Sequence, residues 1–82
     1  LSEAYPNPSS HHAYFDYKLP NGINNATLMV HNLLGSKVNE IKIIEPSGKI
    51  ELNSSELNEG IYFCTLLVKN EVIVSKKLVV NR

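Results

Sequence analysis

The chain has no tryptophan and only one cysteine among its 82 residues. A single cysteine excludes an internal disulfide, which many small exported domains need for stability. Eight basic residues balance eight acidic ones, so the chain lacks the positive excess that general nucleic-acid binding requires. It has no apolar run long enough to span a membrane, and it begins without a methionine or a signal peptide. We therefore expect a domain cut from a larger protein, without a transmembrane segment or a nucleic-acid partner.

Helical periodicity is also missing, because clusters of Gly, Pro and Asn recur before a helical pattern can develop. Alternating or continuous apolar runs stand between these turn signals. The runs cover residues 11–19, 26–32, 38–44, 50–52, 60–68 and 72–80. The proline-containing residues 1–10 can lie along a sheet edge. The pattern predicts an all-β, immunoglobulin-like antiparallel β-sandwich of about seven strands, formed by the whole chain as one domain.

Residues 60–68 are the strongest predicted strand. They are apolar on both faces, which predicts a strand inside a sheet and covered on both sides. The spacing of Gly60 and Tyr62 is typical of a tyrosine corner, in which the Tyr hydroxyl bonds to the backbone of the preceding loop, here residues 58–60. Leu57 is expected to tuck under the sandwich.

The sequence also predicts how the two ends of the chain pack. Tyr5 is expected to anchor the opening segment by pointing inward. Four residues of the last strand are expected to share one face. They are Val72, Val74, Leu78 and Val80.

No residue pattern indicates catalysis or metal binding. Cys64 has apolar neighbours and is expected to be a buried hydrophobe. His11 and His12 are adjacent on a strand and point to opposite faces, so they cannot easily chelate one ion. Asp16 and Glu40 fall on predicted outward faces. The expectation is therefore a domain that is not an enzyme and has no cofactor, metal or small-molecule substrate.

Four short motifs follow one another along the chain. They are Tyr5-Pro6-Asn7-Pro8, Leu34-Gly35-x-x-Val38, Gly60-Ile61-Tyr62-Phe63 and Lys76-Lys77-Leu78-Val79-Val80. Each is unspecific alone, but in this order they resemble the C-terminal sorting domain of the type IX secretion system, type A, over essentially the whole chain. The sequence departs from the usual family pattern at His31, Ser36 and Cys64.

The resemblance implies a non-catalytic signal that directs an N-terminal cargo through the outer membrane of a Gram-negative bacterium. The implied partners are type IX translocon and shuttle components, the cargo domains, and a cell-surface sortase that cuts at or upstream of Leu1. The implied location is the periplasm in transit, then the cell surface or the medium.

The resemblance also assigns roles to residues. The sorting signal itself falls on Lys76, Lys77, Leu78, Val79, Val80 and Arg82. The mainly structural family positions are Tyr5, Pro6, Asn7, Pro8, Leu34, Gly35, Val38, Gly60 and Tyr62.

The last predicted strand indicates how a receptor would read this signal. At a sheet edge it would accept an added strand, with receptor pockets for Leu78 and Val80. Acidic groups of the receptor would face the basic residues Lys76, Lys77 and Arg82. The same edge would permit self-association.

The alternative function is a carbohydrate-binding or adhesion sandwich. Such a module needs an exposed aromatic platform, and Tyr14 is the aromatic residue on a predicted outward face away from Tyr5 and Phe63.

Overall fold

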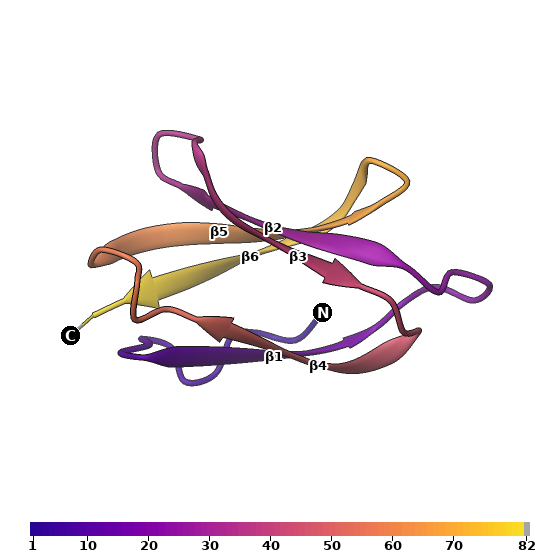
Figure 1. Cartoon of the computed structure of the whole chain (residues 1–82), viewed down its shortest axis with the longest axis horizontal. Helices are drawn as coiled ribbons and strands as arrows, with labels where there is room; N and C mark the ends of the chain where they lie inside the picture. Colours follow the sequence, from indigo (N-terminus) through magenta and orange to yellow (C-terminus); the bar gives the residue numbers. More distant parts are fainter. Residues whose placement is uncertain (82) are drawn as a thin grey trace.

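Six antiparallel strands in two sheets make up the computed structural model, which describes residues 1–81 and has no helix in that range. The strands are β1 (His12–Lys18), β2 (Ala26–Asn32), β3 (Lys37–Ile43), β4 (Ser47–Asn53), β5 (Gly60–Val68) and β6 (Glu71–Val80). One sheet pairs β1 with β4, and the other has the order β3-β2-β5-β6. Figure 1 shows the two sheets as stacked layers. The predicted all-β sandwich is confirmed, with six strands where about seven were expected.

The core lies between the two sheets, where strand alternation directs the apolar side chains. Phe15 of β1 and Leu52 of β4 are fully buried, and they face Leu28, Cys64 and Leu78 of the larger sheet. Leu57 packs against this core, as predicted. Cys64 is buried, as predicted, and its burial raises the pKa of its thiol to about 12.

Within residues 1–81, only one face of the larger sheet is covered by other parts of the chain. β5 lies between β2 and β6, as predicted for an interior strand. Its inward residues, such as Tyr62 and Leu66, are buried, whereas Phe63 on the other face is 38% exposed. The prediction that β5 is covered on both faces is therefore wrong, because the β1–β4 sheet shields one side alone.

A β-bulge changes the packing of β6. Leu66 lies opposite Val74, but Leu67 lies opposite Val72, so one extra residue interrupts the alternation of β6. Val72 is consequently 65% exposed, while Leu78 and Val80 remain in the core. The prediction that Val72 shares their face is wrong for this reason.

Residues 1–10, here called the strap, close one side of the sandwich. Tyr5 exchanges backbone hydrogen bonds with Tyr14 of β1, and Ser9 forms a parallel bridge with Val80 of β6. Ala4 points inward and is buried, so the adjacent Tyr5 points outward and is 37% exposed. Tyr5 is therefore not the predicted inward anchor.

Candidate functional site

The four sequence motifs meet at one end of the sandwich, here called the motif end. In the β5–β6 ladder, Gly60 pairs with Val80, which also forms the bridge to Ser9 of the strap. The turn at residues 33–36 lies beside the start of β5, and Leu34 and Ile61 both line a pocket of about 230 Å³ there. Figure 1 shows the β2–β3 turn, the start of β5 and the end of β6 at this end.

The tyrosine corner forms as predicted. The Tyr62 hydroxyl donates a hydrogen bond of 2.7 Å to the carbonyl of Asn58. The ring is buried between the sheets, so this bond satisfies the one polar atom of the side chain. The corner ties the loop before β5 to the strand that carries the third motif.

The second motif shapes an exposed turn and contributes little to the core. Gly35 has a φ of 87°, and the side-chain oxygen of Asn32 accepts hydrogen bonds from the backbone N–H groups of Leu34 and Ser36, each 3.0 Å long. This geometry leaves the Leu34 side chain 92% exposed and Val38 39% exposed. The turn therefore presents apolar surface to its surroundings.

The free edge of β6 is occupied near its C-terminal end. The Val79 N–H donates to Asn7 Oδ1 at 2.9 Å, and Asn7 Nδ2 donates to the Lys77 carbonyl at 3.2 Å. Ser9 adds two backbone bonds: its N–H donates to the carbonyl of Val79 at 2.8 Å, and its carbonyl accepts from Asn81 at 2.9 Å. The expectation of an open receptor edge is therefore wrong for residues 77–81 while the strap is in place.

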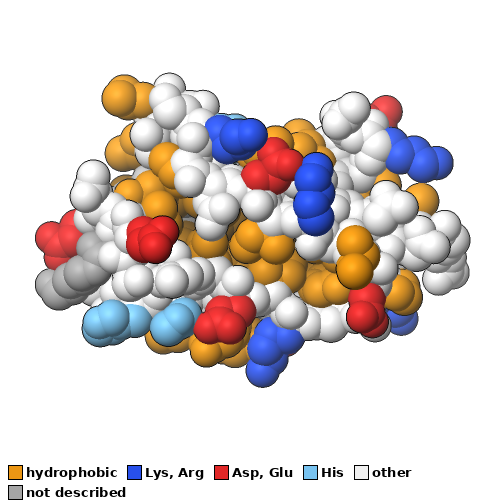
Figure 2. All heavy atoms as spheres, in the orientation of Figure 1, with side chains coloured by type: hydrophobic (Ala, Val, Ile, Leu, Met, Phe, Trp, Pro, Cys, Tyr) orange, Lys and Arg blue, Asp and Glu red, His pale blue; other side chains and the backbone are white. Residues whose placement is uncertain are grey.

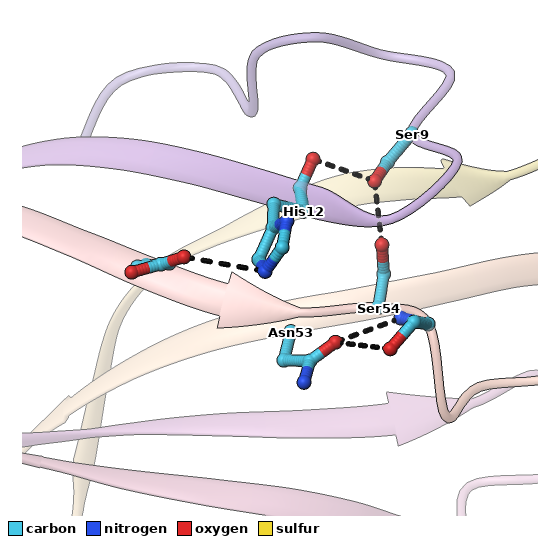
Figure 3. Close-up of polar contacts among 6 residues, drawn as sticks. Ser9, His12, Asn53 and Ser54 are labelled. Atoms are coloured by element: carbon cyan, nitrogen blue, oxygen red, sulfur yellow. Dashed lines mark hydrogen bonds and ion pairs between the residues drawn. The ribbon is translucent and has the colours of Figure 1, made fainter.

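A buried pair of serines fixes the strap to the rest of the domain (Figure 3). The Ser9 hydroxyl donates to the His12 carbonyl at 2.8 Å and lies 2.6 Å from Ser54 Oγ. Both serines are fully buried, and Ser54 N–H also donates to the His11 carbonyl at 2.8 Å. The sequence analysis missed this pair, because no local pattern links two serines that lie 45 positions apart.

The last motif divides into two sets by side-chain direction. Leu78 and Val80 are buried in the domain's own core, so the expected receptor pockets for them are not compatible with the folded state. Lys76 shares their side of the strand, and its Nζ lies 2.7 Å from Glu3 Oε2 of the strap.

The second set lies on the opposite side of the strand, where Lys77 is exposed and Val79 is half-buried. Arg82 lies outside the described residues.

The described residues hold no group of three or more His, Cys, Asp or Glu that could bind a metal ion. His12 Nε2 lies 3.4 Å from Glu51 Oε2 on the surface. Asp16 is exposed and accepts a hydrogen bond of 2.9 Å from the Tyr5 hydroxyl. Residues 1–81 contain no helix that is long and apolar enough to cross a membrane.

Two aromatic residues lie together on the outer face of the smaller sheet. The ring centroids of Tyr5 and Tyr14 are 5.9 Å apart, but the planes are tilted by 31°. The Lys49 ammonium lies over the Tyr14 ring, 5.6 Å from its centroid. A sugar stacking on that face of Tyr14 would have to displace the lysine. This geometry gives the carbohydrate-binding alternative no support.

Comparison with known proteins gives one family and no individual relative. The family model described as "Secretion system C-terminal sorting domain" matches residues 3–81. No curated protein and no solved structure matches the chain. The match spans all four motifs, so the chain belongs to the secretion system C-terminal sorting domain family and is a type IX secretion C-terminal sorting signal.

Proposed function

We propose that this domain directs an N-terminal cargo through the type IX outer-membrane translocon, and that the machinery recognises the folded motif end. The observation that carries the proposal is the convergence of four distant motifs at one end of the sandwich. A sorting signal implies interaction with the secretion machinery and export to the cell surface or the medium. Recognition of a folded surface explains why the motifs are spread along the whole chain.

The residues of the last motif then have two kinds of role. Leu78 and Val80 hold the terminal strand in the core, and Lys76 ties that strand to the strap through Glu3. Lys77 and Val79 face outward and contact the machinery. Arg82, which lies outside the described residues, is proposed to join this contact through its positive charge. The signal therefore combines residues that hold the terminal strand in place with exposed residues that the machinery recognises.

We further propose that a cell-surface sortase separates the domain from its cargo upstream of Ser2. The Ser2 N–H donates to the Asp16 carbonyl at 2.7 Å, and its hydroxyl accepts from the Asp16 N–H at 2.8 Å. Leu1 packs against the core. A protease needs an accessible extended segment, and these contacts hold the strap against β1 from its second residue onward.

A reporter assay tests the proposal. A fluorescent protein with an N-terminal export signal is fused to residues 1–82 and expressed in a bacterium with a working type IX system. We expect the reporter at the cell surface or in the medium, and a reporter without the domain in the periplasm. A fusion that ends at Ser75 should also stay in the periplasm, because it loses Leu78 and Val80 from the core. Retention of the complete fusion would contradict the proposal.

A further inference from the structure

The outer face of the larger sheet, turned away from β1 and β4, is a surface that the structure leaves uncovered. In Figure 1 the β2–β3 turn and the β5–β6 turn both rise on this side, and the outline in Figure 2 dips between them. The face is therefore a shallow saddle with apolar residues at both raised ends. Leu34 is exposed at one end and Val72 at the other.

A row of basic and aromatic residues crosses this saddle. The strand registers place Lys37 opposite His31, His31 opposite Phe63, and Phe63 opposite Lys77, so all four lie side by side on four strands. Phe63 is 38% exposed at the centre of the row. The next row, towards the motif end, contains the half-buried pair Ile61 and Val79. Phe63 thus lies between the basic residues His31 and Lys77, with Ile61 and Val79 in the next row.

Positive charge exceeds negative charge on the paired, outward positions of this face in residues 1–81. Lys37, Lys42 and Lys77 lie there with a single carboxylate, Glu40. Glu40 is shared by two of the lysines, at 3.1 Å from Lys37 and 2.9 Å from Lys42. The chain as a whole is neutral, so its positive and negative charges are unevenly distributed over its surface, with a positive excess on this face.

We propose that this face, which we call the saddle, is the surface by which the export machinery holds the signal. The partner is a protein whose contact surface surrounds apolar side chains with carboxylates. Burial of Phe63, Ile61 and Val79 supplies binding energy, and the lysines select an acidic surface and steer its approach. The inference rests on the proposed function and adds to it the chemistry of the partner.

Two other occupants fit the saddle less well. A second copy of the domain would bring two lysine-rich faces together, and like charges across an interface oppose association. An anionic membrane is bound firmly by clusters of about four to eight basic residues. The saddle has three lysines in its paired positions, and Glu40 neutralises part of their charge.

The reporter fusion with residues 1–82 tests the inference through paired variants. Lys77→Glu and Phe63→Thr should each lower the exported fraction about tenfold, as expected when a central contact is lost. Lys18→Glu makes the same charge change on an exposed position of β1, and Ile44→Thr removes an exposed apolar side chain outside the saddle. Both controls should be exported like the unchanged fusion.

A third kind of variant increases the free positive charge of the saddle. Glu40→Gln removes the carboxylate that pairs with Lys37 and Lys42, so the exported fraction of this fusion should be at least as large as that of the unchanged fusion.

Each purified variant domain should still unfold cooperatively, with a melting temperature well above that of the export assay, which separates loss of recognition from loss of folding. Normal export of Lys77→Glu and Phe63→Thr would overturn the inference, while export of the unchanged fusion would still uphold the proposed function. Retention of the unchanged fusion would refute both. A loss with Glu40→Gln as large as with Lys77→Glu would exclude an acidic partner.

Two further measurements address the other occupants. Co-sedimentation of the isolated domain with phosphatidylglycerol vesicles, abolished by Lys77→Glu, would assign the saddle to lipid and overturn the inference. A dimer in light scattering that Phe63→Thr dissociates would assign it to a second copy, with the same consequence. We expect a monomer that does not sediment with the vesicles.

Discussion

The backbone N–H of Val79 donates a 2.9 Å hydrogen bond to the side-chain oxygen of Asn7, which precedes it by 72 positions. The same Asn7 side chain donates to the carbonyl of Lys77 at 3.2 Å. One amide group thus satisfies two backbone groups that a neighbouring strand would otherwise pair. Because open strand edges promote unwanted pairing, Asn7 gives the first motif a structural purpose: it covers the strand that carries the last motif.

Replacement of Asn7 by Ala should weaken this closure. Both side-chain bonds to β6 are lost, and the exposed site allows water to replace them in part, so the free energy of unfolding should fall by about 1 kcal/mol. Urea denaturation measures the loss, and hydrogen exchange at the Val79 amide should become faster. Asn21→Ala, in the exposed loop between β1 and β2, is the matched control and should change neither quantity. Unchanged exchange at Val79 would contradict the assigned contact.

The Ser9 and Ser54 hydroxyls should be energetically coupled. Each single change to Ala disturbs a fully buried polar contact, so each should cost about 1–3 kcal/mol of unfolding free energy. The double variant should cost less than the sum by about 0.5–1.5 kcal/mol, because the shared bond is lost only once. A double-mutant cycle in urea provides the measurement, and additive losses would show that the two side chains act independently.

Substitutions of two adjacent residues in the last motif should reduce secretion for different reasons. Leu78 is fully buried, so Leu78→Ala should lower the unfolding free energy by about 2–5 kcal/mol and reduce secretion through unfolding. Lys77 is exposed, so Lys77→Ala should change that free energy by less than about 0.5 kcal/mol and still reduce secretion. Denaturation of the purified domains, beside secretion of the reporter fusions, distinguishes the two. Equal destabilisation by both changes would refute the division of roles.

The Cys64 thiol should be unreactive in the folded domain and should make stability depend on alkaline pH. Burial raises its pKa to about 12, from an ordinary value of 9.0 for a cysteine thiol. The folded state therefore keeps the proton where the unfolded state releases it. The stabilising contribution is complete below about pH 9 and is lost as the pH rises towards about 12. Iodoacetamide should label Cys64 slowly at pH 8 in buffer and rapidly in urea; rapid labelling in buffer would contradict the burial.

Much of the fold was predictable because strand alternation is a local property of the sequence. Phe15 and Leu28 lie in the core, and Tyr62 forms its corner with Asn58. The direction of Tyr5 was not predictable, because it depends on how the strap pairs with β1. Val72 departs from its expected face because a bulge in the ladder with β5 shifts the register.

The site was predictable only as a set of motifs. The sequence indicates which residues belong to the terminal strand, and the structure shows that Leu78 points into the core and Lys77 away from it. The contacts that join the strap to this strand involve Glu3 and Ser9. Both are far from their partners in sequence, so no local pattern identifies them.

Export that depends on the type IX translocon is the most direct test of the central claim. The fluorescent reporter fused to residues 1–82 would be expressed in two strains that differ only in a functional type IX translocon, and its surface, medium and periplasmic fractions would be quantified. The account predicts a reporter that is exported in the first strain and periplasmic in the second. Export in both strains, or periplasmic retention in both, would contradict it.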